Sequence, residues 1–386
     1  MKLCDVTQAY NRTSGGIKTY IHEKRRYLKS HTDWEHILIV PGERDRCIIE
    51  DRTRTYEIAS PFIPGCEPYR IIMNLEAVTG ILEREHPDII ELGSAYTLPW
   101  AVFKHAERYK CIVAAYYHTD FPTAYVETTV KRFLGARSAK LAKAVAMKYA
   151  GFVYGKCDFV MVPSTIFIRY LGHCHIQRIE HVSLGIDTVQ YSPSHRDMGI
   201  RRRLGISDEE FMLVYMGRLD TEKHIDTLLK AYSLLRIDLP SSLLMIGNGP
   251  LYKDLDARKK EYPGLIIMPY TSDKHELAGL LASSDLYVTA GPHETFGLSV
   301  LEAQSSGLAV VGVNAGALPD RISDNVGALC PVDDYREMAK AITHICRNGL
   351  LKMGANARRM VEDHYSWDRT FNRIFYLYEQ YQSTSA

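Results

Sequence analysis

Short apolar segments alternate with amphipathic stretches along almost the whole chain. The apolar segments are four to six residues long, and most are rich in β-branched residues; they cover 36–40, 88–92, 111–115, 159–162, 211–216, 242–246, 286–289 and 308–312. Between them, residues 226–235 and 277–284 repeat their apolar positions with the period of a helix. Buried parallel strands are continuous apolar runs, so this pattern predicts an α/β fold with helices on both faces of parallel sheets.

The alternation stops and restarts once, near the middle of the chain. Residues 181–196 are rich in turn-forming residues, and a polar helix and a new strand at Phe211 follow. One core rarely grows beyond about 250–300 residues, and the chain has 386. We therefore expect two doubly wound, Rossmann-like domains, 1–195 and 196–363, that face each other across a crevice, with the aromatic segment 364–386 packing back on the first.

Composition excludes several classes of protein. Hydrophobic residues make up 46% of the chain and charged residues 24%, with a net charge of +1, so we expect a globular protein and no nucleic-acid partner. No apolar run approaches the ~18 residues of a membrane-spanning helix. Eight cysteines without a C-x-x-C pair, and an N-terminus without an apolar signal core, predict a cytoplasmic location. We read His173-Cys174-His175 as a loop and expect no metal.

The near-zero net charge is a sum over two unequal halves. Residues 1–195 carry 25 Lys and Arg against 21 Asp and Glu, a balance of +4, and residues 196–386 carry 22 against 25, or −3. Residues 128–157 contain no acid and seven bases: Lys131, Arg132, Arg137, Lys140, Lys143, Lys148 and Lys156.

A helical wheel over residues 128–157 predicts one basic amphipathic helix. Its basic side would hold Arg132, Arg137, Lys140, Lys143 and Lys148, and its other side Leu134, Leu141, Val145, Tyr149 and Phe152. Such a helix suits the surface of an anionic membrane. The alternative is a helix that packs on the core and exposes a solvated face.

The sharpest chemical motif covers residues 292–303, Pro-His-Glu-Thr-Phe-Gly-Leu-Ser-Val-Leu-Glu-Ala, between a strand and a helix. Glu294 precedes the helix, and Glu302 lies about two turns into it. Gly297 allows a ligand to approach the backbone, and the free N–H groups of the first turn form an anion site. Carboxylates bind sugar and ribose hydroxyls, so the motif suits a sugar nucleotide. The alternative is an ordinary capped helix with Glu302 in solvent.

A second motif, Gly217-Arg-Leu-Asp-Thr-Glu-Lys223, follows the strand 211–216. Two cations at a strand's carboxyl end can neutralise a diphosphate leaving group without a metal. On their own, Arg218 and Lys223 could equally be surface cations.

Three weaker motifs follow other strands. Residues 11–17, Asn-Arg-Thr-Ser-Gly-Gly-Ile, place paired glycines at a helix start, which favours anions. His118 and Asp120 follow the strand 111–115 on a loop that we expect to face the crevice. The turn Gly247-Asn-Gly249 lacks the third glycine of a dinucleotide fingerprint, so an oxidoreductase is excluded.

Together these motifs resemble the GT-B retaining glycosyltransferases of family 4, in the right order from residue 1 to about 370. The matching residues are Ser14-Gly-Gly-Ile17, His118-Thr-Asp-Phe-Pro122, Gly217-Arg-Leu with Lys223, Gly247-Asn-Gly249 and Glu294-Thr-Phe-Gly-Leu with Glu302. The version Tyr-His-Thr-Asp-Phe-Pro with a basic helix after it looks most like the branch that glycosylates lipids, which includes sulfoquinovosyl-diacylglycerol synthases and mannosyl or glucosyl transferases.

The resemblance implies roles for individual residues. Glu302 would bind the ribose, Glu294 and His118 the transferred sugar, and Arg218 and Lys223 the diphosphate. The remaining donor contacts would come from Gly16, Gly217, Gly249, Phe296, Gly297 and Leu298, and the acceptor or membrane side from Asp120, Arg137, Lys140 and Lys143. Transfer would retain the anomeric configuration, with the leaving phosphate taking the acceptor's proton, and would need no metal or other cofactor. One departure is the segment Gly316-Ala-Leu-Pro-Asp320, where many members have Gly-Gly-x-Pro-Glu; we read it as structural or nucleotide-adjacent.

We therefore expect transfer of a hexose from a nucleotide-diphosphate sugar, UDP before GDP, to a hydroxyl acceptor, above all a membrane lipid at the inner face of the plasma membrane. A soluble sugar, sugar phosphate or glycan is the alternative acceptor. A nucleotide-sugar epimerase and a non-catalytic binding module are further alternatives, and the presence of Glu294, Arg218 and Lys223 argues against lost catalysis.

Overall fold

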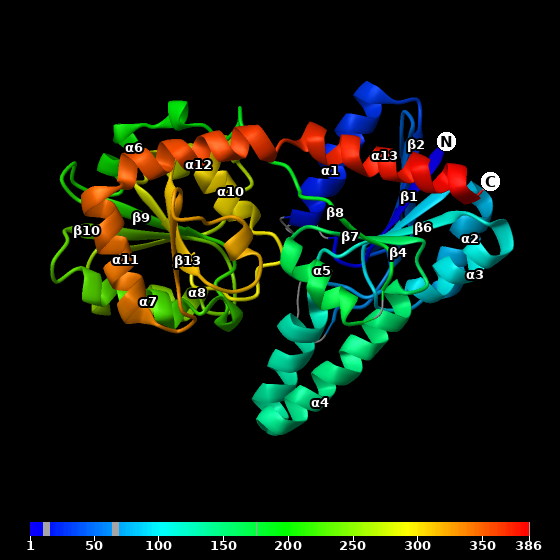
Figure 1. The fold of residues 1–386 in the computed structure, drawn as a ribbon, viewed down its shortest axis with the longest axis horizontal. Coiled ribbons are helices and arrows are strands. Elements are labelled where there is room, and N and C mark those ends of the chain that lie inside the picture. The colour runs from blue at the N-terminus through cyan, green and yellow to red at the C-terminus, as the bar shows by residue number, and fades with distance from the viewer. Residues whose placement is uncertain (11–15, 64–68, 175, 386) are drawn as a thin grey trace. The chain divides into compact units, whose positions relative to one another are not determined.

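The computed structural model describes residues 1–10, 16–63, 69–174 and 176–385. The chain divides into two compact units, Met1–Ser183 with Asp368–Ala386, and Leu184–Trp367. The first unit thus ends, in sequence, ahead of residue 195, where the sequence placed the boundary, and it includes nearly all of the C-terminal helix. Each unit is an α/β domain around one sheet (Figure 1).

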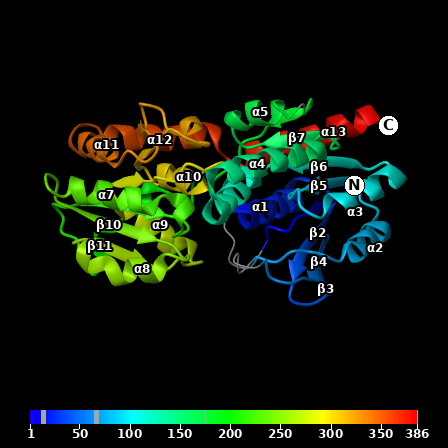
Figure 2. The same ribbon diagram turned by 90° about the horizontal axis from the view of Figure 1, so that it is seen from below.

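The first unit contains an eight-stranded sheet with the order β3-β4-β2-β1-β5-β6-β7-β8, parallel except for β3 (Figures 1 and 2). The strands are β1 (Lys2–Val6), β2 (Glu35–Gly42), β3 (Arg46–Glu50), β4 (Thr53–Ala59), β5 (Ile89–Leu92), β6 (Ile112–Tyr116), β7 (Phe159–Val162) and β8 (Ile179–His181). The direction of the strand order reverses between β1 and β5, which is where ligands bind in such sheets.

Helices cover both faces of this sheet. They are α1 (Gly16–His31), α2 (Leu75–Glu85), α3 (Pro99–Tyr109), η1 (Pro122–Glu127), α4 (Thr128–Tyr154), α5 (Thr165–Gly172) and α13 (Trp367–Ser385). Alternate strand residues such as Cys4, Val6 and Ile90 pack in one core with α2 to α5. The opposite face carries α1 and α13, whose rings contact one another and Phe159 of β7.

The basic segment forms a helical hairpin, so the prediction of one amphipathic helix is wrong. The chain turns at Gly135, which has φ 80° and ψ 174° inside α4, and α4 folds back against η1. A helical wheel is valid only for one straight helix. Glycine adopts positive φ without strain, so Gly135 can interrupt the helix here. Figure 1 shows the two legs projecting beyond the sheet.

The hairpin also fails to separate basic from apolar residues. Leu141, Val145 and Phe152 are exposed, and their spacing of three to four residues places them on the same face as Arg137 and Lys148. Lys143 instead pairs with Glu127 of the other leg, at 2.6 Å. The side chain of Arg132 lies outside the described part of the chain.

The second unit contains a six-stranded parallel sheet with the order β11-β10-β9-β12-β13-β14. Its strands are β9 (Phe211–Met216), β10 (Ser241–Ile246), β11 (Leu265–Met268), β12 (Leu286–Val288), β13 (Ala309–Val313) and β14 (Gly327–Cys330). Its helices are η2 (Pro193–His195), α6 (Met198–Arg203), η3 (Thr221–Lys223), α7 (Ile225–Leu235), α8 (Tyr252–Ala257), η4 (Arg258–Glu261), α9 (Lys274–Ser283), α10 (Leu298–Ser305), η5 (Leu318–Asp320), α11 (Tyr335–Asn348) and α12 (Leu350–His364). Here the order reverses between β9 and β12.

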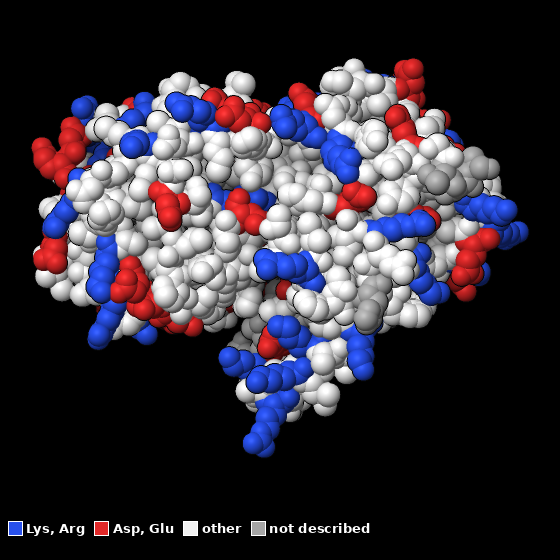
Figure 3. All heavy atoms as spheres, viewed as in Figure 1, with Lys and Arg blue, Asp and Glu red and all other residues white. Residues whose placement is uncertain are grey.

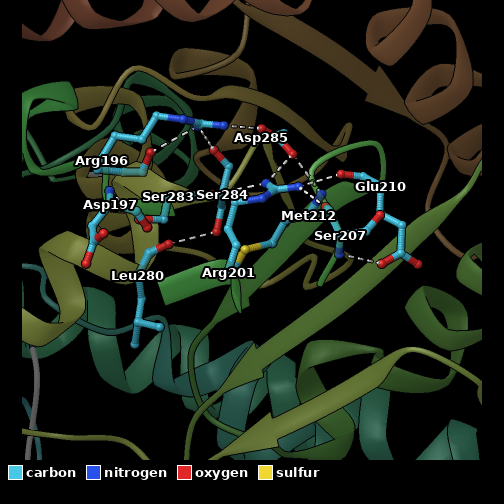
Figure 4. Close-up of polar contacts among 11 residues, drawn as sticks. Arg196, Asp197, Arg201, Ser207, Glu210, Met212, Leu280, Ser283, Ser284 and Asp285 are labelled. Carbon is cyan, nitrogen blue, oxygen red and sulfur yellow. Dashed lines mark hydrogen bonds and ion pairs between the residues drawn. The ribbon is translucent and has the colours of Figure 1, made fainter. Parts of the chain in front are cut away.

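An ion-pair network around the buried Arg201 anchors the start of the second unit at the amino ends of β9 and β12 (Figure 4). Asp285 accepts from Arg201 at 2.8 Å, from Arg196 at 2.9 Å and from the amide of Met212 at 2.8 Å. Arg201 also donates to the carbonyl of Ser207 at 3.1 Å. Because buried charges are costly unless paired, this network fixes α6 against the sheet and has a structural role.

Candidate functional site

The strongest candidate site lies at the carboxyl ends of β9 and β12, where the strand order of the second unit reverses. Lys223 follows β9 and Glu294 follows β12, and the Lys223 Nζ lies 2.6 Å from the Glu294 Oε1. These side chains are 17% and 21% exposed, so the pair is reachable from solvent. The structure thereby brings together the two charged motifs that the sequence placed at separate strand ends, at the position where doubly wound sheets bind ligands.

The electrostatics keep this region charged. Burial opposes the charge of Lys223, but Glu294 and Glu222 outweigh it and raise the pKa of the amine. Arg218 is more exposed and donates to Asp220 at 2.8 Å. A diphosphate can therefore meet one fixed cation and one more accessible cation.

The turn before α10 adds backbone donors. Gly297 caps this helix with φ +84°, a conformation that glycine adopts without strain, and Phe296 beside it is buried. The hydroxyl of Tyr287 donates to the carbonyl of Met216 at 3.0 Å and meets the Ser299 hydroxyl at 2.9 Å. Tyr287 thus links the first turn of α10 to the end of β9. The predicted phosphate-binding amides are therefore held close to the loop that carries Arg218 and Lys223.

Glu302 lies further along α10 and has an unusual environment. Burial raises its pKa to about 7, against the opposing effects of a hydrogen bond from Tyr191 and the charge of Lys274. Sequence reasoning missed Tyr191, because it belongs to the turn-rich stretch that we read only as a linker. Its carbonyl accepts from Ser305 at 2.6 Å and from Arg358 at 2.7 Å, which holds the linker against α10.

The glycines of the donor motifs allow loops to pack closely. A Cβ on Gly249 would lie 2.3 Å from the carbonyl oxygen of Leu219, and one on Gly217 would lie 2.9 Å from the Tyr215 hydroxyl. The segment 316–320, which differs from the family pattern, also packs here. The Ala317 amide donates to the Glu294 carbonyl at 2.8 Å, and a Cβ on Gly316 would lie 2.6 Å from the same oxygen. The loop after β13 therefore supports Glu294.

A second pair that the sequence did not reveal lies beside Lys223. His224 Nδ1 and Asp333 Oδ1 are 2.6 Å apart, and both residues have positive φ, 50° and 64°. Non-glycine residues rarely adopt this region, and such strained positions cluster at functional sites. The His224 ring also lies 6.4 Å from that of His293, next to Glu294.

In the first unit, His118 follows β6 as expected. Its ring centroid lies 4.4 Å from that of Tyr116 and 4.9 Å from that of Tyr20. Burial, with a smaller effect of the Lys24 charge, lowers its pKa to about 3, so the imidazole is neutral near pH 7. A neutral ring can donate to or accept from sugar hydroxyls.

The other first-unit predictions meet different outcomes. Asp120 accepts from the hydroxyls of Tyr117 at 2.9 Å and Tyr170 at 3.1 Å, which fixes its orientation. Gly16 opens α1, whereas residues 11–15 of the same motif lie outside the described residues. Arg137 and Lys140 are exposed on the hairpin. His175 also lies outside the described residues, and in the part that is described no group of three potential ligands is placed to hold a metal ion.

A buried polar network lies behind His118. Lys24 Nζ contacts Asp5 at 2.7 Å and Glu91 at 2.9 Å, and the Tyr20 hydroxyl donates to Glu91 at 3.0 Å. The hydroxyl of Tyr378, on α13, also donates to Glu91. Burial raises the pKa of Glu91 to about 7.

Comparison with known proteins agrees with this geometry. A glycosyltransferase family 4 model matches residues 14–190, and a model of group 1 glycosyl transferases matches residues 199–363. The fold is similar to that of sucrose-phosphate synthase from Thermosynechococcus elongatus, with a TM-score of 0.81, 17% identity and 99% of each chain covered. The fold and the two family models therefore define a GT-B glycosyltransferase.

Among relatives, the chain is 28% identical to a GDP-mannose-dependent α-(1-6)-phosphatidylinositol dimannoside mannosyltransferase of Mycobacterium tuberculosis, over 96% of this chain and 93% of the relative. It is 27% identical to the sulfoquinovosyl transferase SQD2 of Arabidopsis thaliana, over 63% and 46%. The chain belongs to the family 4 glycosyltransferases, as the motifs predicted. No helix among the described residues is long and apolar enough to cross a membrane.

Proposed function

We propose that the protein transfers mannose, with retention of configuration, from GDP-mannose to a hydroxyl of a membrane lipid. The observation that carries the proposal is the Lys223–Glu294 pair beside the first turn of α10. It offers a carboxylate for sugar hydroxyls and a cation with backbone amides for a diphosphate.

The mechanism follows from which groups change charge. As the bond between the sugar C1 and the diphosphate oxygen breaks, negative charge grows on the diphosphate, and Lys223 and Arg218 stabilise it. The acceptor hydroxyl attacks C1 from the face that the diphosphate leaves, and its proton passes to a diphosphate oxygen. Glu294 binds sugar hydroxyls, and Glu302 binds the ribose. In the first unit, the neutral ring of His118 is suited to hydrogen bonds with sugar hydroxyls. Two cations replace the role of a metal, so we expect activity to persist in EDTA.

The names of the relatives change the expected nucleotide base from uracil to guanine. UDP was favoured from the sequence, but several relatives are named GDP-mannose-dependent mannosyltransferases. A thermal-shift panel of GDP, UDP and ADP tests the base, because a ligand that binds only the folded state raises the melting temperature. GDP should give the largest shift; a larger shift with UDP would overturn the choice of base.

The transfer itself is tested with GDP-mannose and membrane lipid extract, with NMR of the product's anomeric centre. An α-mannosyl lipid is expected, and it should form in EDTA. An inverted product would contradict retention, and transfer only to soluble sugars would contradict the lipid acceptor. An isomerised sugar from donor alone would reveal an epimerase instead.

We further propose that the hairpin of η1 and α4 binds the surface of an anionic membrane. The tip residues Phe133 and Leu134 are 74% and 69% exposed, beside Lys131 and Arg137. Figure 3 shows basic side chains gathered over this projection. Apolar side chains that enter the bilayer, ringed by bases that contact anionic headgroups, explain why the hairpin exposes both kinds of residue.

Vesicle flotation tests this surface. Wild-type protein should float with phosphatidylglycerol vesicles and much less with phosphatidylcholine vesicles. The double change Phe133→Ser and Leu134→Ser should weaken binding at least about ten-fold, since burying each large apolar side chain contributes about 1.5–3 kcal/mol. Leu351→Ser is the control, because Leu351 is a still more exposed apolar residue, on α12 and away from the hairpin. Equal flotation with both vesicle types, or an unchanged double variant, would refute the surface.

A further inference from the structure

Arg321 is a buried arginine directly behind the turn that opens α10. It follows η5, and only 2% of its surface is exposed. Its Nε donates to the carbonyl of Phe296 at 3.2 Å, and its Nη1 donates to the Tyr365 hydroxyl at 3.1 Å. The guanidinium also lies over two rings, 4.2 Å from the centroid of Phe296 and 5.0 Å from that of Tyr365.

These contacts constrain the direction of a backbone amide. In a planar trans peptide, the carbonyl of one residue and the N–H of the next point in opposite directions. The Phe296 carbonyl points at the buried Arg321, so the Gly297 N–H points away from it. Gly297 has positive φ and offers no side chain to restrain the turn, so the restraint comes from Phe296.

The position of Arg321 is itself fixed from α10. The Gln304 amide donates to the Arg321 carbonyl at 2.8 Å, and Arg321 Nη1 donates to the Asp320 carbonyl at 3.3 Å. The guanidinium therefore links three elements: the turn before α10, η5 and the end of α12. Lysine carries a similar charge but lacks the planar fork that contacts three oxygens and two rings at once.

We propose that Arg321 is a positioning residue for diphosphate recognition, which it serves by aiming the Gly297 amide. The proposal rests on the proposed function, since it requires that the turn binds a nucleoside diphosphate. It makes a specific claim: loss of Arg321 weakens recognition of the diphosphate and leaves recognition of the nucleoside part intact.

The test compares GDP with GMP, and UDP with UMP, by calorimetric titration of the full chain. For Arg321→Lys we expect at least about ten-fold weaker binding of the diphosphate, with monophosphate affinity changed less than about two-fold. Tyr365→Phe removes only the hydroxyl partner and should weaken diphosphate binding about two- to five-fold, in line with one lost hydrogen bond. Should Arg321→Lys fail to fold, Tyr365→Phe decides the matter.

Arg201→Lys is the matched control. Arg201 is an equally buried arginine of the same unit, held by Asp285 and carbonyl oxygens at the amino ends of the strands. It should lower the melting temperature without changing the ratio of diphosphate to monophosphate affinity. An unchanged ratio in Tyr365→Phe and in folded Arg321→Lys, or an equal loss for both nucleotides, would overturn the proposal. Failure of wild type to bind any nucleoside diphosphate would instead refute the proposed function.

Discussion

Each of the two units contains a close lysine–glutamate pair, and the two pairs differ in burial and in the number of further hydrogen-bond partners. Lys24 lies 2.9 Å from Glu91, and Lys223 lies 2.6 Å from Glu294. Lys24 is fully buried, and its carboxylates Asp5 and Glu91 receive further hydrogen bonds from Tyr20, Tyr378 and His36. Lys223 and Glu294 remain partly exposed at the reversal point of a sheet.

We propose that this difference separates a structural ion pair from one that binds a ligand. The Lys24–Glu91 pair is fully buried and its polar atoms are already hydrogen-bonded, so it cannot exchange a partner for a ligand. It instead holds α1, β1, β5 and α13 together. A partly exposed pair between two loops can release each partner to a ligand. The sequence singled out Lys223 and Glu294 because each lies in a charged motif after a strand, whereas it gave no sign of the pair formed by Lys24 and Glu91.

The largest expected effect comes from breaking the enclosed pair. Lys24→Met leaves two buried carboxylates without their cation, which should lower the free energy of unfolding by about 3–5 kcal/mol. The deficit should grow as pH rises. Burial raises the pKa of Glu91 in the folded state and the Lys24 charge lowers it, so without Lys24 this pKa lies still further above that of the unfolded chain. The variant therefore loses more stability than the wild type as pH rises through this range.

Urea denaturation at several pH values measures this effect. Lys29→Met is the control, because Lys29 is exposed on the same helix. A Lys24→Met protein as stable as the control would show that the network does not depend on its cation.

The Lys223–Glu294 pair should behave in the opposite way. Lys223→Ala and Glu294→Ala should each lower turnover at least ten-fold, about 1.4 kcal/mol in the activation barrier. Unfolding free energy should change by less than about 1 kcal/mol, as expected for a partly exposed pair. Lys230→Ala, on the exposed face of α7, should leave both quantities unchanged. Wild-type turnover in both site variants would overturn the site assignment.

The sequence predicted the sheets well and their edges poorly. Buried strands such as 159–162 and 211–216 are uninterrupted apolar runs, and the structure has strands at the same residues. The edge strand β3 is largely exposed and, within the described ranges, pairs only with β4, so it carries no such run. Burial on both faces produces the signal, and an edge strand lacks that burial.

The candidate site shows the same limit. Glu294, Lys223 and Arg218 could be predicted, because loops at strand ends keep charged residues only where they can be solvated or used. Tyr191 and Arg321 act through contacts between segments far apart in sequence, to Glu302 and Phe296. Their residue types are ordinary, and only the packing reveals their role. The prediction of one amphipathic helix over residues 128–157 failed at Gly135, because a single residue with positive φ reverses the chain.

The smallest effect concerns Glu302 and sharpens the comparison from within the second unit. In the proposed function its carboxylate accepts hydrogen bonds from ribose hydroxyls, which the ionised form accepts more strongly than the protonated form, and burial raises its pKa to about 7. The donor KM should therefore fall as pH rises from about 6 to about 8, through the pKa range of this group. Tyr191→Phe removes a hydrogen bond that favours the ionised form, so the fall should move to higher pH, and KM near pH 7 should rise about two- to ten-fold. Tyr262→Phe, which loses a tyrosine hydroxyl bound to Arg258 instead, should keep the wild-type profile. An equal rise in KM at every pH would show that Tyr191 acts by packing alone. It would also show that the hydrogen bond from Tyr191 does not set the pKa of Glu302.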